Sequence, residues 1–161
     1  KNHYLKPLVI VLVALLVFSG ILDFFPILND SKIVIADYPK NKDIVWIMKN
    51  TNSRLDFLNT QYLYDNASLA GRKIFLGWPY FAWSQGYDTL NRDNLRKSLL
   101  NSSNLSYFCT KAKINNLGYA EINVQNQDIL INTSFFEKNF PKIYQNNTTG
   151  TFIYNIKSVC S

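Results

Sequence analysis

The residues best suited to binding chemistry lie close together, in residues 66–88, which read NASLAGRKIFLGWPYFAWSQGYD. Two adjacent cations, Arg72 and Lys73, are followed by aromatic side chains at positions 78, 80, 81, 83 and 87. An arginine can hold a phosphate by two parallel hydrogen bonds, and amphipathic rings stack on sugars or lie among lipid headgroups. We predict a ligand-binding surface formed by Arg72, Lys73, Trp78, Tyr80 and Trp83. The alternative is that these rings belong to the core and the glycines of the segment make turns.

No known catalytic or cofactor motif accompanies this segment. The sequence has no G-x-x-x-x-G-K-[ST], no G-x-G-x-x-G and no G-x-S-x-G pattern. One histidine and two cysteines exclude a His/Cys zinc cluster and a histidine-dependent triad built within this chain. Asp88, which follows Gly-Tyr, is typical of a turn or a helix cap. We therefore assign no catalytic residue, no metal and no cofactor.

An uncharged apolar run precedes this segment. Residues 7–22 read PLVIVLVALLVFSGIL and lie between Lys6 and Asp23. A membrane-spanning helix needs roughly 20 apolar residues, and aromatic residues at both ends extend this run to residues 4–24. We predict a transmembrane helix there. A signal-peptide core and a buried core helix are the alternatives.

The flanking charges predict an orientation for this helix. Lys1 and Lys6 precede the run and Asp23 follows it, so the positive-inside rule places the N-terminus in the cytoplasm. Residues 24–161 are then extracytoplasmic, in a secretory lumen or at the cell exterior. We expect residues 1–29 to be the helix with its flanks and residues 30–161 to be one domain. Because the first residue is not Met, we expect the chain to be part of a longer protein.

The charge and the asparagines are informative about partners. The net charge of +6 is scattered, with no block of Lys and Arg, so the lipid bilayer is an expected partner and nucleic acid is not. The 20 asparagines head seven N-x-[ST] sequons, where chance gives roughly 2.5. These glycosylation candidates all follow the apolar run: Asn29, Asn66, Asn101, Asn104, Asn132, Asn146 and Asn147. The adjacent pair Asn146 and Asn147 would rarely both be modified. An Asn-rich composition without glycosylation is the alternative.

Cys109 and Cys160 are the only cysteines of the chain. In an oxidising compartment they form one natural disulfide, and we predict that bond. Two unpaired thiols are the alternative.

The residue pattern of residues 30–161 predicts an α/β domain. Short apolar runs favour strands at residues 31–37, 54–59, 73–77, 106–113 and 119–124. Helical spacing and caps favour helices at residues 40–50, 89–100 and 132–140. Residues 66–71 fit a loop or a short helical turn. Residues 141–145 and 151–157 flank NNTTG and predict a C-terminal β-hairpin, which completes a mixed sheet.

The stretch LAGRKIFLGWPYFAWSQGYD, residues 69–88, resembles part of the C-terminal extracytoplasmic domain of large polytopic membrane proteins. Those proteins are similar to the GT-C class of glycosyltransferases, which use polyprenyl-phosphate sugars. The resemblance includes a last transmembrane helix ending like SGILDF (residues 19–24), a helix like residues 43–50 and a closing hairpin like residues 150–156. It implies that the catalytic acid lies in an early luminal loop that this sequence does not contain.

These observations predict an accessory domain of a GT-C-like membrane protein. It would cap the transmembrane part and help to position the donor or acceptor of sugar transfer, without a catalytic acid of its own. One alternative is a single-span structural or accessory subunit of a membrane complex. Another is a lectin-like binding module, which requires exposed Trp78 and Trp83.

Overall fold

A computed structural model describes residues 5–29, 40–125 and 129–161 of the chain, and the side chains of residues 5, 19 and 21–29 lie outside the description. The chain divides into two units, Lys1–Ile35 and Ala36–Ser161. The predicted strand at residues 31–37 lies outside the described residues. Each unit is described by itself below.

The first unit contains α1 (Leu5–Asn29), a helix of 25 residues. From Leu8 to Phe18 every large apolar side chain is more than half exposed, and the apolar residues surround the helix on all sides. Along the part of the chain that the structure describes, no helix is both long and apolar enough to cross a membrane. This finding gives the predicted transmembrane helix no support.

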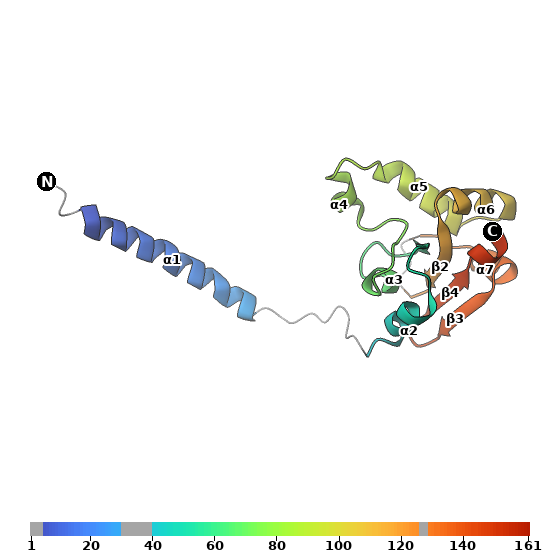
Figure 1. The fold of residues 1–161 in the computed structure, drawn as a ribbon, viewed down its shortest axis with the longest axis horizontal. Coiled ribbons are helices and arrows are strands. Elements are labelled where there is room, and N and C mark those ends of the chain that lie inside the picture. The colour runs from blue at the N-terminus through green and yellow to red at the C-terminus, as the bar shows by residue number, and fades with distance from the viewer. Residues whose placement is uncertain (1–4, 30–39, 126–128) are drawn as a thin grey trace. The chain divides into compact units, whose positions relative to one another are not determined.

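The second unit is an α/β domain built on a mixed four-stranded sheet (Figure 1). The strands are β1 (Asp56–Asn59), β2 (Leu117–Asn123), β3 (Lys142–Asn146) and β4 (Thr151–Asn155). They lie in the order β1-β2-β4-β3, with β1 parallel to β2 and the other pairs antiparallel. The predicted mixed sheet and its C-terminal hairpin are confirmed.

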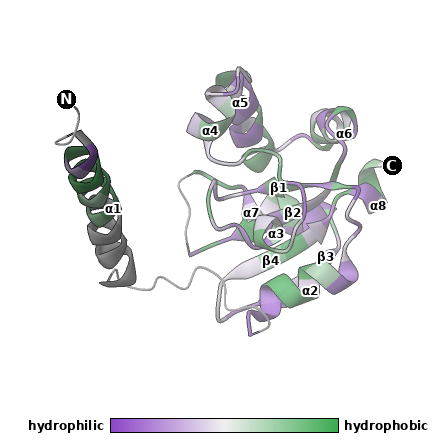
Figure 2. Cartoon of the chain, turned by 60° about the vertical axis from the view of Figure 1, so that its left-hand side comes forward, coloured by the Kyte–Doolittle hydropathy of each residue, from purple (hydrophilic) through white to green (hydrophobic). Residues whose placement is uncertain are grey.

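Helices cover both faces of this sheet (Figure 2). α2 (Lys42–Asn50) and α3 (Asn66–Leu69) pack on one face, against Phe57 and Ile153. On the other face lie α5 (Thr89–Leu100), α6 (Leu105–Ile114), α7 (Thr133–Asn139) and α8 (Lys157–Cys160). Because helices lie on both sides, all seven residues of β2 are buried.

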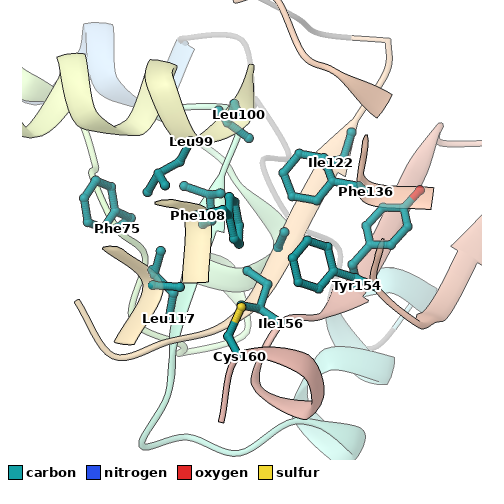
Figure 3. Close-up of a cluster of buried hydrophobic side chains, with 14 of the residues drawn as sticks. Phe75, Leu99, Leu100, Phe108, Leu117, Ile122, Phe136, Tyr154, Ile156 and Cys160 are labelled. Atoms are coloured by element: carbon teal, nitrogen blue, oxygen red, sulfur yellow. The ribbon is translucent and has the colours of Figure 1, made fainter. Parts of the chain in front are cut away.

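The core between the sheet and α5, α6 and α7 is rich in phenylalanine (Figure 3). The ring of Phe108 lies 5.1–5.7 Å from the rings of Phe135, Phe136 and Phe140, measured between centroids. Leu99 and Leu100 of α5 join this cluster. A shared core of this kind fixes α5, α6 and α7 on one side of the sheet.

Two predicted strands are corrected by the structure. Residues 106–113 form α6, because Leu105, Phe108, Cys109 and Ala112 repeat with helical spacing and Asn104 caps the helix through the Tyr107 N–H. Residues 73–77 make a single bridge to β1, between Phe57 and Ile74, and no strand. The predicted helices are confirmed as α2, α5 and α7, and the predicted short helical turn is α3. Two short helices, α4 (Pro79–Trp83) and α8, were not predicted.

The predicted disulfide is confirmed, since Cys109 and Cys160 are bonded. It joins α6 to α8 and closes a loop of 51 residues in sequence separation. Both helices lie at the same end of the phenylalanine-rich core, where Figure 3 shows Cys160 beside Ile156. The bond therefore fastens the C-terminal helix to the helical layer rather than to a strand.

Candidate functional site

A polar cleft of about 600 Å³ opens at one edge of the sheet. The parallel strands β1 and β2 end at this edge, and β4, which runs antiparallel to β2, begins there with Thr151. The carboxyl ends of parallel strands are where α/β domains commonly bind ligands. The cleft is lined by the loop after β1, the end of β2, the β3–β4 turn and the starts of α2 and α3.

The lining of the cleft combines amides, hydroxyls, one carboxylate and aromatic rings. The amide and carboxylate side chains are Asn41, Asp43, Gln61, Asn66, Asn123 and Gln125. The hydroxyls and rings come from Thr148, Thr149, Tyr62, Tyr64 and Trp78. Among the described residues that line it, none is Lys or Arg. This surface offers many hydrogen-bond donors and acceptors and no fixed cation.

The wall after β1 is held by buried polar contacts. Arg96, which is fully buried on α5, donates hydrogen bonds to the carbonyls of Asn59 (3.1 Å) and Thr60 (3.2 Å). Its guanidinium lies 4.0 Å from the centroid of the Tyr62 ring and pairs with Asp93 at 3.1 Å. The Tyr62 hydroxyl also donates to Asp93, at 2.7 Å. These contacts fix the position of the Tyr62 ring, one of the aromatic rings that line the cleft.

Trp78 contributes a second aromatic ring to the lining. Its ring meets the Tyr62 ring edge-on, with centroids 6.2 Å apart and planes at 87°, and the residue is 43% exposed. Tyr64, also in the lining, has a positive φ of 58°, a conformation that non-glycine residues rarely adopt. Strained backbone of this kind is held by its surroundings and is common in binding loops.

One end of the cleft is organised around Asp43 in the first turn of α2. The buried Asp43 carboxylate accepts hydrogen bonds from the side chains of Tyr144 (2.7 Å), Asn146 (2.7 Å) and Thr149 (2.6 Å). Burial, followed by the bond to Asp43, raises the pKa of the Tyr144 hydroxyl far above its usual value. The Asp43 carboxylate thus ties α2 to the β3–β4 hairpin.

A second acidic group lies behind Asn66. Asp65 and Glu121 are buried together, and burial followed by their mutual interaction raises the pKa of Asp65, while burial raises that of Glu121. Glu121 accepts hydrogen bonds from the Asn66 side chain (2.9 Å) and the Ala67 N–H (2.9 Å). Asp65 also accepts from the Ala67 N–H, as the N-cap of α3. Glu121 therefore orients Asn66, which lines the cleft.

The two acidic ends are connected. The Thr149 hydroxyl, which donates to Asp43, lies 3.1 Å from the Thr151 hydroxyl. The Asn66 amide is in turn 3.4 Å from Thr151. A continuous chain of polar side chains therefore runs behind the cleft from Asp43 to Glu121.

The structure brings one of the five predicted ligand-binding residues into this cleft, namely Trp78. Arg72 caps the C-terminus of α2, with hydrogen bonds to the Met48 carbonyl (2.7 Å) and the Thr51 side chain (3.0 Å). Lys73 is exposed outside the lining, as are Tyr80 and Trp83 on α4. The alternative in which the rings of residues 78–87 form core is wrong, because these side chains are 43–69% exposed.

The sequence patterns did not reveal the three buried acids at this cleft, Asp43 in the lining and Asp65 and Glu121 behind it. A signal was present for Glu121, a single acid inside the buried strand LGYAEIN, because a buried charge needs nearby partners. No such signal marks Asp43 or Asp65, which look like ordinary helix-start residues. Within the described part of the chain, no cluster of three His, Cys, Asp or Glu can hold a metal ion.

The sequons lie in different environments. Asn101, Asn104 and Asn147 are exposed, whereas the side-chain amides of Asn66, Asn132 and Asn146 donate hydrogen bonds within the domain. Asn104 and Asn132 also cap helices, which accounts for part of the Asn-rich composition. The side chain of Asn29 lies outside the described residues.

No protein-family model matches this chain, and no curated protein matches its sequence. The cleft is therefore interpreted from its own chemistry.

Proposed function

We propose that this chain is a membrane-anchored extracytoplasmic domain that binds the sugar part of a donor or acceptor in the cleft. In this proposal it is an accessory domain of a GT-C-like membrane glycosyltransferase, and it positions the sugar for a catalytic part that lies elsewhere. The proposal rests on the sequence resemblance of residues 69–88 for the class of protein and on the cleft for the ligand.

The observation that carries the proposal is the composition of the cleft. A sugar ring presents hydroxyls, which pair with amides and carboxylates, and an apolar C–H face, which packs on an aromatic ring. The amide side chains of Gln61, Asn66 and Gln125 line the cleft together with the rings of Trp78 and Tyr62. Ligand sites typically combine rings with a few fixed polar groups in this way.

The charge of the cleft supports a neutral ligand. The described lining holds Asp43 and no Lys or Arg, and Asp65 and Glu121 lie behind it. A phosphate would meet the Asp43 carboxylate without a cation in the described lining, which is unfavourable at short range. The sugar moiety, rather than the phosphate of a polyprenyl-phosphate donor, is therefore the part assigned to this cleft.

Membrane anchoring is proposed for α1, with residues 4–24 spanning the bilayer and residues 24–161 outside. The exposed apolar side chains from Leu8 to Phe18 support it, because a helix that is apolar on all sides requires an apolar environment. The scattered positive charge of the chain fits anionic headgroups.

The test is ligand binding by the full chain in detergent micelles. Binding of glucose, mannose, N-acetylglucosamine and inorganic phosphate is measured by ligand-observed NMR, for the wild type and for Trp78→Ala and Trp83→Ala. We expect one of the sugars to bind and phosphate not to bind. Trp78→Ala should weaken binding about tenfold, because it removes the stacking surface, and Trp83→Ala, outside the cleft, is the matched control.

Three results would sink the proposal: binding of phosphate alone, no binding of any sugar at millimolar concentration, or equal effects of the two tryptophan variants. A domain that binds no sugar but copurifies with other membrane subunits would favour the structural-subunit alternative.

A further inference from the structure

A patch of large apolar side chains lies just beyond the cleft, on α4 and at the start of α5. We call it the α4 patch, and its members are Tyr80, Phe81, Trp83, Tyr87 and Leu90. They are 62–72% exposed, and α4 contains no buried residue at all. Singly exposed apolar residues are ordinary, but five within eleven positions form a surface that normally has a partner.

Hydrogen bonds hold the backbone that carries the α4 patch. The Ser84 N–H donates to the Tyr80 carbonyl at 3.0 Å, and the Tyr87 N–H donates to the Ala82 carbonyl at 3.2 Å. Gly86, with a φ of 85°, supplies the left-handed turn between them. Asp88 then caps α5 through the Asn91 N–H, at 3.1 Å. The backbone that carries the patch thus has a fixed shape.

The chemistry of the α4 patch fits the headgroup layer of a membrane. Tyr80, Trp83 and Tyr87 combine an apolar ring with a polar tip, and such residues are enriched where lipid meets water. Phe81 and Leu90 add purely apolar area. Residues 74–87 contain no charged side chain, so insertion of Tyr80, Phe81, Trp83 and Tyr87 would bury no charge from that segment. Asp88, between Tyr87 and Leu90, is exposed and would have to stay at the polar level of the headgroups.

The length of the chain between α1 and the domain supports lipid as the occupant. Ten residues join Asn29 to Lys40, and a fully extended segment of that length reaches about 35 Å. A domain tethered to a bilayer through α1 therefore stays close to the membrane surface, which raises the local concentration of lipid headgroups around the whole domain, the α4 patch included.

We infer that the α4 patch inserts into the headgroup layer of the bilayer. The inference rests on the membrane anchoring in the proposed function. Trp78, which lines the cleft, directly precedes α4. Insertion of the α4 patch therefore brings the aromatic side of the cleft to the membrane surface, where the sugar of a lipid-linked donor lies.

The three tryptophans of the chain allow a test with an internal control. The full chain is reconstituted into phosphatidylcholine vesicles with bromine atoms near the top of the acyl chains, which quench nearby tryptophans. Trp46→Phe/Trp78→Phe leaves Trp83 as the only reporter, and Trp78→Phe/Trp83→Phe leaves Trp46. Trp46 stacks on Tyr144 and belongs to α2, across the sheet from α5 (Figure 2).

We expect Trp83 to be quenched at least about twofold more than Trp46. Adding Tyr80→Ser and Phe81→Ser should bring the quenching of Trp83 down to that of Trp46, because it removes two of the rings that would insert. Neither side chain is buried, so the fold of the domain should be unaffected. Tyr107→Ser, which removes an exposed ring from α6, is the matched control and should change nothing.

Equal quenching of Trp83 and Trp46 in protein that floats with the vesicles would overturn the inference and leave the anchoring intact. Protein that does not float with vesicles would overturn both. Protection of Trp83 from acrylamide in the absence of lipid, with a doubled molecular mass, would show that a second copy of the chain covers the α4 patch and would also overturn the inference.

Discussion

Asp65 and Glu121 are buried side by side behind Asn66, and they play unequal parts. Glu121 accepts hydrogen bonds from three donors: the N–H groups of Asn66 and Ala67 and the Asn66 side chain. The Asp65 carboxyl is fully buried and interacts with Glu121, and burial followed by that interaction raises its pKa well above the usual range. We interpret the pair as a protonated Asp65 that donates to an ionised Glu121.

The first prediction compares two isosteric variants of this pair. In Asp65→Asn the side-chain NH2 donates to Glu121 in place of the carboxyl proton, and the side-chain oxygen still accepts from the Ala67 N–H. The free energy of unfolding at neutral pH should therefore be unchanged or increased. Glu121→Gln places an amide group against N–H donors and should cost about 2 kcal/mol. Urea unfolding of the two variants measures both. A larger loss in Asp65→Asn than in Glu121→Gln would contradict the assignment.

The pair also predicts a pH dependence. Because folding raises the pKa of Asp65, its contribution to stability is complete below the ordinary carboxyl pKa and is lost as the pH rises through the raised value. The wild-type free energy of unfolding should therefore decline relative to that of Asp65→Asn as the pH rises. The plots of unfolding free energy against pH for the two proteins should converge in acid. Parallel plots would contradict a protonated Asp65 in the folded state.

A second prediction concerns Arg96, which holds the Tyr62 side of the cleft. Arg96→Met leaves the carbonyls of Asn59 and Thr60 and the Asp93 carboxylate without this donor, and should destabilise the domain by about 3 kcal/mol. Lys97→Met is the matched control, because Lys97 pairs with the same Asp93 from a half-exposed position and its loss should destabilise the domain far less than the loss of Arg96. Thermal unfolding distinguishes them, and equal losses would contradict a structural role for the buried arginine.

Arg72 and Arg96 show that contacts between residues distant in the sequence cannot be predicted from local patterns. Arg72 was predicted to bind a ligand because Lys73 and a run of aromatic residues follow it. It instead caps the last turn of α2 through Met48, 24 residues away, a contact that no local pattern reveals. No local pattern singled out Arg96, which is fully buried on α5. Elements with a strong local signal, such as α5 and the hairpin, were predictable. The cleft joins five separate segments, so its existence depends on the packing of the whole sheet.

The error in α6 has a similar cause. Residues 106–113 contain aromatic and β-branched residues, which favour strand, but burial of Phe108 and Ala112 against the phenylalanine cluster requires helical spacing. Tertiary packing overrode the local preference. Two of the three buried acids were unpredictable for a different reason, because a carboxylate at a helix start is usually solvated.

A third prediction concerns the disulfide. Cys109 and Cys160 close a loop of 51 residues, and removing the bond should cost about 4 kcal/mol if loop entropy dominates. Cys109→Ser/Cys160→Ser should therefore lower Tm by roughly 10–15 °C, and wild-type protein treated with dithiothreitol should melt at the same temperature as the double variant. Melting curves that do not respond to reductant would show that α8 is held by packing alone.

The last prediction separates the sequons by structure. When the chain is expressed in a eukaryotic secretory pathway, mass spectrometry of glycopeptides should find glycans at Asn147 and at Asn101 or Asn104, which are exposed. Asn66 should be unmodified in folded protein, because a glycan on its amide would displace the bond to Glu121. Asn146 should also be unmodified, because its amide donates to Asp43 at 2.7 Å. A folded, secreted species with a glycan at Asn66 would contradict the polar chain from Asp43 to Glu121, and with it the architecture assigned to the cleft.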